Sequence, residues 1–423
     1  MFRPALLLLC LLAAGVTPEA VPLSLEEAVA EAQRANASLP VAQAEMAVAA
    51  AQLREAHGKM RPQLSLQGDV IYLPPKLGYG QSPSPQEDRL QLVGRQPLYA
   101  GGGLRAAVRQ SEAHLQSAAA RYRAAEKDVE LQVRTQFATG KKLEAELHFR
   151  TSGVLRLRDY LTSIQSRRAG GQGLTADMLK TQAQLAGDQA NVAAVQRALA
   201  EARVMLNDLL GRDPWDGLTL APLPSLKPPE GELPQAQAWE RSPEVLAAQS
   251  DLVASRSAVE VARALRRPHL DLEADTGWFG PGFDGTGTFG SRLRSDYGLS
   301  VGLFFSWQFW DFGAYRGVLA QAQGLARQGE ATLAVDRRKA RAQWELAQVD
   351  LTGLYEEVGG RARAMPLALD AYLQAESLYR GGAGTTLEVL DAYNVSILAQ
   401  EAYSEAVLAY RVAEANARRW GAP

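Results

Sequence analysis

The chain has 423 residues, enough for two or three ordinary domains, and a formal net charge of −2. Aromatic residues make up only 7% while alanine is abundant, which suits long helices packed through small side chains better than a bulky globular core. The charge argues against a nucleic-acid partner, because no Lys/Arg block is dense enough to neutralise a phosphate backbone.

The N-terminal residues have the pattern of an export signal. Arg3 precedes an apolar run from Ala5 to Ala14, and small residues follow. We therefore predict a secretory signal peptide over residues 1–20, too short to span a membrane as a mature helix. After Ala20 no stretch of about 18 apolar residues occurs. The exported chain must then meet a membrane, if it does, without a membrane-spanning helix.

The rest of the chain is an internal duplication. Three motifs recur in the same order: RPQLSL at 61–66 and RPHLDL at 267–272, LYAGGGLR at 98–105 and FWDFGAYR at 309–316, RAGGQGLTADML at 168–179 and RGGAGTTLEVL at 380–390. We predict a first structural repeat over 21–211, a Pro-rich linker over 212–232 and a second repeat over 233–423.

Each half is predicted to contain a pair of strands and two very long helices. Ser24 and Glu27 have the spacing of a capping box that opens the first helix. The strands are expected near 63–72, 89–98, 269–279 and 297–310. The long helices are expected over 104–168, 174–210, 314–379 and 386–420.

Apolar and polar residues alternate along the expected strands. In 297–309 Tyr, Leu, Val and Phe side chains alternate mostly with Gly, Ser and Gln. This alternation over about ten residues is typical of a transmembrane β-barrel strand, but a half-buried sheet in a soluble domain alternates in the same way. Because four strands cannot close a barrel, the membrane interpretation requires several chains to pool their strands.

The expected helices are unusually long. From Leu104 to Arg168 there is no proline, and a helix over that stretch would extend roughly 97 Å. Apolar residues such as Leu104, Val108 and Leu115 follow the 3-4 spacing of coiled-coil packing. Such helices must form a tube, a rod or a bundle with partners.

These features together resemble the TolC-like outer-membrane efflux proteins. The resemblance rests on the RPxLxL entries to the strands, the strand-to-helix turns and the two glycine-rich helix-turn-helix tips, duplicated in order. It implies a mainly α fold with a small β part: a duplicated long-helix coiled-coil α-barrel plus four transmembrane β-strands per chain. A homotrimer would close these strands into a 12-stranded barrel, three chains giving four strands each.

The resemblance also implies a function. Such a protein is a passive exit duct in the outer membrane that extends into the periplasm and exports drugs, metals or secreted proteins. Its partners would be outer-membrane lipid, a periplasmic membrane-fusion (adaptor) protein and an inner-membrane transporter, and it would need no cofactor.

The implied functional residues lie at the helix tips. Gly171, Gly173, Gly382 and Gly384 would form the adaptor-contacting tips. The residues Asp177, Tyr379, Glu388 and Asp391 would form the pore constriction or gate.

Glu388 and Asp391 would give two acidic rings with some pKa values raised by repulsion. Asp177 and Tyr379 match positions that pair across neighbouring helices to keep the pore closed. Gly384 stands where some members carry an arginine, so no simple arginine latch is expected there.

Two other interpretations remain open. Glu388 and Asp391 can instead be acids that the macrodipole favours at a helix N-terminus. The whole chain can instead be a soluble periplasmic coiled-coil adaptor or scaffold, although that class has one helical hairpin and a membrane anchor. Catalysis and metal binding are not expected, because the four histidines, His57, His114, His148 and His269, are widely spaced.

Overall fold

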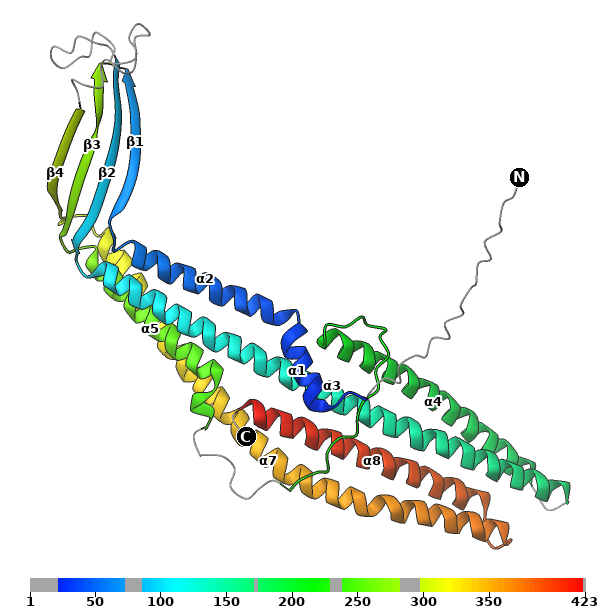
Figure 1. The fold of residues 1–423 in the computed structure, drawn as a ribbon. Helices are drawn as coiled ribbons and strands as arrows, with labels where there is room; N and C mark the ends of the chain where they lie inside the picture. Colours follow the sequence, from blue (N-terminus) through cyan, green and yellow to red (C-terminus); the bar gives the residue numbers. More distant parts are fainter. Residues whose placement is uncertain (1–21, 73–85, 171–173, 229–237, 282–296, 421–423) are drawn as a thin grey trace, which may run out of the picture. The chain divides into compact units, whose positions relative to one another are not determined.

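The computed structural model describes residues 22–72, 86–170, 174–228, 238–281 and 297–420 (Figure 1). The chain forms two compact units. The bundle unit comprises Met1–Ala37, Glu126–Ala236 and Glu345–Pro423, and the sheet unit comprises Ser38–Ala125 and Gln237–Trp344. Each unit therefore draws on both halves of the sequence, because the helices α3 (Gly103–Ala169) and α7 (Ala314–Arg380) are long enough to contribute to both. The predicted signal peptide lies outside the described residues.

The sheet unit contains one antiparallel sheet with the strand order β1-β2-β3-β4 (Figure 1). Its strands are β1 (Gln63–Tyr72), β2 (Gln86–Ala100), β3 (His269–Pro281) and β4 (Tyr297–Ser306). The expectation that the last strand continues to residue 310 is wrong. After Ser306 the chain leaves the sheet, since the Trp307 indole donates a hydrogen bond to the Arg266 carbonyl at 3.0 Å and the turn into α7 begins.

The strand register gives the sheet one apolar and one polar face. Two neighbouring rows across the apolar face are Leu64–Gly94–Ala274–Val301 and Leu66–Leu92–Thr276–Leu299. Rows of the other face are Gln63–Arg95–Glu273–Gly302 and Ser65–Val93–Asp275–Ser300. Arg95 and Asp271 form an ion pair of 2.5 Å on that face. The period-two alternation seen in the sequence is thus aligned across all four strands.

The two strand-to-helix turns share one backbone conformation. Gly101 and Gly102 have φ of 63° and 85°, and the equivalent Phe312 and Gly313 have φ of 50° and 97°. A Cβ on Gly101 would lie 2.7 Å from the Cβ of Arg267, so glycine is required there. Phe312 is the exception, since a left-handed conformation costs an L-residue about 1–2 kcal/mol.

Helices α2 (Ser38–Gly58) and α5 (Pro243–Ala264), the short η1 (Ala238–Arg241) and the adjoining parts of α3 and α7 complete the sheet unit. They pack closely through small residues: a Cβ on Gly103 would lie 2.8 Å from the Cβ of Ala264. Arg121 and Asp251 form an ion pair of 2.7 Å between α3 and α5. Across the described ranges, no helix combines the length and the apolar composition that crossing a membrane requires.

The bundle unit consists of α1 (Leu25–Ala35), α4 (Thr175–Leu209), α8 (Thr386–Arg419) and the remaining parts of α3 and α7. The predicted capping box is confirmed: the Ser24 N–H donates to Glu27 at 2.9 Å, and the Ser24 hydroxyl accepts from the Glu27 N–H. Near the turn between α7 and α8, the bundle unit is held together by a core cluster on α3, α7 and α8. This cluster consists of Leu157, Tyr160, Ile164, Tyr372, Tyr379, Val389, Leu390, Tyr393 and Ile397.

The described part of the Pro-rich linker, residues 212–228, belongs to the bundle unit and is hydrogen-bonded within it. The Leu23 N–H donates to the Thr219 carbonyl at 2.8 Å, and the Ala221 N–H donates to the Leu23 carbonyl at 2.9 Å. At the start of the linker, the Arg212 guanidinium holds both oxygens of Glu31 at 2.5 and 2.6 Å. The segment is therefore anchored at several points along its length.

Candidate functional site

The turn between α7 and α8 is closed by backbone hydrogen bonds. Gly382 has φ of 82°, and its N–H donates to the Tyr379 carbonyl at 3.0 Å. The N–H groups of Ala383 and Gly384 both donate to the Leu378 carbonyl, at 2.9 and 3.2 Å. This is a glycine C-cap. A Cβ on Gly384 would lie 3.1 Å from the Tyr379 nitrogen, a tight contact, so a side chain here would require a small shift of the turn.

The first carboxylate after this turn caps its own helix. The Thr385 N–H donates to Glu388 at 2.8 Å, and the Thr385 hydroxyl accepts from the Glu388 N–H. The hydrogen bond from the Thr385 backbone lowers the pKa of the exposed Glu388 carboxyl, so this group stays ionised in the single chain. The capping role is readable in the sequence as the T-x-x-E spacing.

Asp391 follows Glu388 by three residues and is also exposed. The two carboxylates lie on one face of α8, because residues three apart in a helix are neighbours. Glu388 thus combines the helix-terminal role with a solvent-facing charge. That Glu388 and Asp391 belong to acidic rings remains a prediction, since rings require further copies of the chain.

The first tip joins α3 to α4. Gly171 and Gly173 lie outside the described residues. Asp177 is half-buried in the first turn of α4, and its charge is one of the influences that raise the pKa of Tyr160. The Asp177 carboxylate therefore influences the phenol of Tyr160 on α3 through its charge.

Tyr379 is also brought to Tyr160. The two rings meet edge to face with their centroids 5.1 Å apart, and Tyr379 is buried. Tyr379 thus contacts Tyr160, whereas Asp177, which sequence analysis paired with Tyr379, acts on Tyr160 through its charge. Burial raises the pKa of Tyr160 well above its usual value. Tyr160 itself was missed, because nothing in its local sequence distinguishes it from other helical tyrosines.

Arg167 is a second residue that sequence analysis missed. Its guanidinium lies 4.8 Å from the centroid of the Tyr379 ring and donates to the Tyr379 carbonyl. It therefore connects the last turn of α3 with the last turn of α7. A basic residue in the last turn of a helix is the only local signal for this role.

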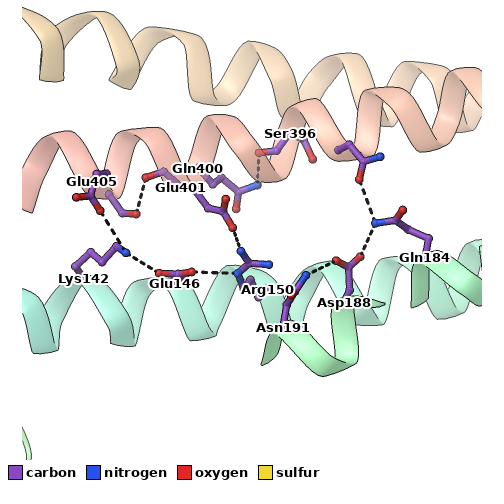
Figure 2. A network of polar contacts seen from close by, with 12 residues as sticks. Lys142, Glu146, Arg150, Gln184, Asp188, Asn191, Ser396, Gln400, Glu401 and Glu405 are labelled. Carbon is purple, nitrogen blue, oxygen red and sulfur yellow. Dashed lines mark hydrogen bonds and ion pairs between the residues drawn. The ribbon is translucent and has the colours of Figure 1, made fainter. Parts of the chain in front are cut away.

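Behind the tips, a polar network joins three helices of the bundle unit (Figure 2). On α3, Arg150 contacts Glu146 at 3.1 Å and also Glu401 of α8. Lys142 contacts Glu146 at 2.9 Å and Glu405 at 3.3 Å. Burial raises the pKa of Glu401 above its usual value, although Arg150 opposes this. The network ties α3 to α8 with paired charges.

On the α4 side of the same network, Gln184 donates to Asn394 at 3.1 Å and to Asp188 at 3.3 Å (Figure 2). In the part of the chain that the structure describes, no group of three or more His, Cys, Asp or Glu side chains is placed to hold a metal ion. Gln184 thus connects α4 to α8 through Asn394.

The second candidate surface is the apolar face of the sheet. Leu64 and Leu66 on β1 are 76% and 70% exposed, and Leu299 and Val301 on β4 are 73% and 66% exposed. A soluble half-buried sheet would cover such a face with packed side chains. An exposed apolar face on strands of about ten residues has the dimensions of a membrane-spanning sheet.

A sheet of this kind joined to paired long helices defines a class by architecture: proteins with an exposed apolar sheet and a long helical extension. The chain belongs to the outer membrane efflux protein family, whose sequence profile matches residues 28–212 and again residues 235–419. The family consists of outer-membrane channels that extend into the periplasm, so the chain is an outer-membrane protein and not an enzyme. The soluble-scaffold alternative is thereby set aside.

Individual relatives agree with this assignment. Protein CyaE of Bordetella pertussis is 28% identical over 303 residues, covering 70% of this chain and 62% of CyaE. The pyoverdine export outer membrane protein OpmQ of Pseudomonas aeruginosa is 26% identical over 249 residues, covering 57% of this chain and 50% of OpmQ. The matches thus span less than two thirds of these relatives.

The fold has close counterparts among solved structures. The outer-membrane channel OprN superposes with a TM-score of 0.85 at 23% identity, covering 94% of this chain and 90% of OprN. At this identity the likeness concerns the fold alone. It supports the expected fold class of long paired helices with a small antiparallel sheet, while closure of a barrel by several copies remains a proposal.

Proposed function

We propose that this chain is a passive exit duct in the outer membrane, built as a homotrimer and coupled to an inner-membrane transporter through a periplasmic adaptor protein. Three copies would contribute four strands each to a 12-stranded barrel. The helices would continue the duct into the periplasm, and the helix tips would form its entrance.

The observation that carries this proposal is the apolar face of the sheet. Its residues are exposed in the single chain, although the same strands present Arg95, Asp271, Glu273 and Asp275 on the other face. A membrane-spanning sheet needs an apolar face toward lipid and has no unpaired edges. Since β1 and β4 are the edges of the described sheet, further copies of the chain are the natural partners for them.

The tips support the entrance end of the duct. Gly382 and Gly384 turn α7 back into α8, and the exposed Glu388 and Asp391 follow directly. With Gly171 and Gly173 of the first tip, these glycines are the proposed adaptor contacts. Tyr379, which contacts Tyr160, and Asp177, in the first turn of α4, are proposed to set the width of the constriction. Threefold repetition of Glu388 and Asp391 would favour cations at the entrance.

The cargo class follows from the relatives only as a proposal. OpmQ is a pyoverdine exporter by its name, and the fusaric acid resistance protein FusA of Burkholderia cepacia is 29% identical over 212 residues. We infer a duct for small molecules or secreted proteins, with selection made mainly by the pump. The experiment is membrane fractionation followed by planar-bilayer recording. A heat-resistant trimer from the outer membrane that conducts ions supports the proposal, and a soluble periplasmic monomer contradicts it.

The acidic rings need a test that separates charge from helix capping. Glu388→Gln keeps the capping box, because glutamine serves at that position, while Asp391→Asn removes an exposed charge. The double variant should have reduced cation selectivity at unchanged thermal stability. Glu388→Ala is the matched control, since it removes the cap as well and should lower stability. Unchanged selectivity in the double variant would refute the rings.

A further inference from the structure

An exposed aromatic run follows β4 directly. Trp307, Phe309, Trp310 and Phe312 occupy four of six consecutive positions, and Trp310 and Phe312 are 70% and 94% exposed. The equivalent stretch of the first half, QPLYAG at 96–101, has a single aromatic residue, Tyr99. The run is therefore a feature of the second half and not of the duplicated turn itself.

Phe312 stands where the backbone favours glycine. Its φ of 50° matches the left-handed Gly101 of the first half, and its side chain is almost fully exposed. Both the strained backbone and the exposed ring are unfavourable in water. Strain of this kind persists only where the surrounding structure enforces it, and it is concentrated at functional sites. Insertion of the ring into an apolar environment would compensate for this strain.

The run also continues the apolar face of β4. Leu299, Val301, Leu303 and Phe305 are exposed on that face, and the aromatic run begins two residues after Phe305. Tryptophan side chains favour the boundary between acyl chains and headgroups, because one part of the ring is apolar and its N–H is polar. The aromatic run thus lies where the apolar face ends.

The positively charged side chain of Arg266 belongs to a residue that contacts the run, because its carbonyl accepts a hydrogen bond from the Trp307 indole. The Arg266 guanidinium is exposed and lies 5.5 Å from the centroid of the Tyr315 ring. A hollow of about 210 Å³ lies here, lined by Leu265, Arg266, Gln308, Phe309, Tyr315 and Val318 among others. Asp311 also lines it, but its carboxylate accepts from the Gly313 and Tyr315 N–H groups at 3.1 and 2.7 Å. The Asp311 charge is thus directed to the start of α7.

We propose that Arg266 and the Trp307–Phe312 run bind the phosphate headgroup of an anionic phospholipid in the periplasmic leaflet of the outer membrane. The aromatic rings insert at the headgroup boundary, and the guanidinium contacts the phosphate. The inference rests on the proposed function, since it requires the sheet to lie in the membrane. Each chain would supply one such site.

The test uses the full-length protein extracted from vesicles of phosphatidylcholine with or without phosphatidylglycerol. Native mass spectrometry then counts the phosphatidylglycerol molecules that remain bound. Arg266→Gln should weaken phosphatidylglycerol binding about fivefold, as expected for one basic residue at an anionic surface. The control is Arg263→Gln in the last turn of α5, three residues before Arg266, because the Arg263 guanidinium is paired with Glu260 at 2.6 Å. It should retain wild-type binding.

Phe312→Gly supplies a second, independent variant. It places in the second half the residue that the first half has, so it should raise the thermal unfolding temperature and reduce phosphatidylglycerol retention. Wild-type retention in both Arg266→Gln and Phe312→Gly would overturn the site. Dissociation of the assembly by Phe312→Gly would overturn it too, since the run would then be a contact between copies. Ion conductance without any headgroup preference refutes this inference alone, whereas a chain that neither inserts nor conducts refutes the proposed function.

Discussion

Tyr160 of α3 and Tyr379 of α7 meet edge to face, with ring centroids 5.1 Å apart and planes inclined by 67°. The two residues belong to different halves of the duplicated sequence and to the ends of two different helices. Their contact joins the two helical hairpins within one chain. Arg167 covers Tyr379 from the α3 side, so three side chains hold the hairpin ends together.

The first prediction concerns Arg167. Arg167→Gln removes the cation over the Tyr379 ring and weakens the hydrogen bond to its carbonyl, which should cost about 1–2 kcal/mol of local stability. Hydrogen exchange at residues 378–384 should become faster, and single-channel conductance should rise as the tip loosens. Arg168→Gln, at the exposed neighbouring position, is the control. Equal exchange in the two variants would show that Arg167 does not hold the tip.

The second prediction concerns alkaline pH. Burial raises the pKa of Tyr372 to about 12, so the folded state keeps this proton where the unfolded state has lost it. The contribution of protonated Tyr372 to the free energy of unfolding is fully present below about pH 10, the pKa of an unfolded tyrosine. It is lost as the pH rises toward 12. The loss should be on the order of 2 kcal/mol, visible in denaturant titrations at several pH values.

Tyr372→Phe should remove part of that alkaline loss while changing stability little at neutral pH, because the buried hydroxyl has no partner of ordinary geometry among the described residues. Tyr403→Phe, at a half-buried position on α8, should retain the wild-type profile. A Tyr372→Phe profile as steep as that of the wild type would contradict the assignment.

The third prediction concerns the glycine turn. Gly382→Ala forces a Cβ into the left-handed region and should destabilise the chain by about 1–2 kcal/mol. Gly317→Ala on α7 is the matched control, because nothing lies within 4 Å of its would-be Cβ, and it should stabilise by about 0.5–1 kcal/mol. The thermal unfolding temperatures of the two variants, each compared with the wild type, measure these opposite effects. Similar shifts in the two would mean that the turn tolerates a side chain.

The fourth prediction tests the two faces of the sheet with neighbouring residues. Val301→Arg places a charge on the exposed apolar face and should cost about 2–4 kcal/mol of insertion free energy near the middle of the bilayer. Ser300→Arg places the same charge on the face that carries Asp275 and should be tolerated. The yield of heat-resistant assembly from lipid vesicles measures both. Equal yields from the Val301→Arg and Ser300→Arg variants would contradict the prediction that lipid contacts only the apolar face.

The sequence alone determined the features that depend on local patterns. Alternation identified the strands, and the capping box at Ser24 and the glycine run at 381–384 marked helix ends, because caps and turns are formed by residues close in sequence. The duplicated motifs identified the family. The end of β4 could not be predicted, because Trp307 and Phe309 continue the apolar alternation of the strand beyond Ser306, its last paired residue.

Only the tertiary structure decided which distant side chains meet. The neighbours of Tyr379 are Tyr160 and Arg167, more than two hundred residues earlier, and no local pattern encodes that distance. The structure also shows that Glu388 forms the capping box of its own helix, while its place in an entrance stays a prediction because that place depends on further copies of the chain. The tertiary structure also shows that the apolar face of the sheet is exposed in the single chain. Alternation shows that a strand has two faces, whereas packing decides which face is covered.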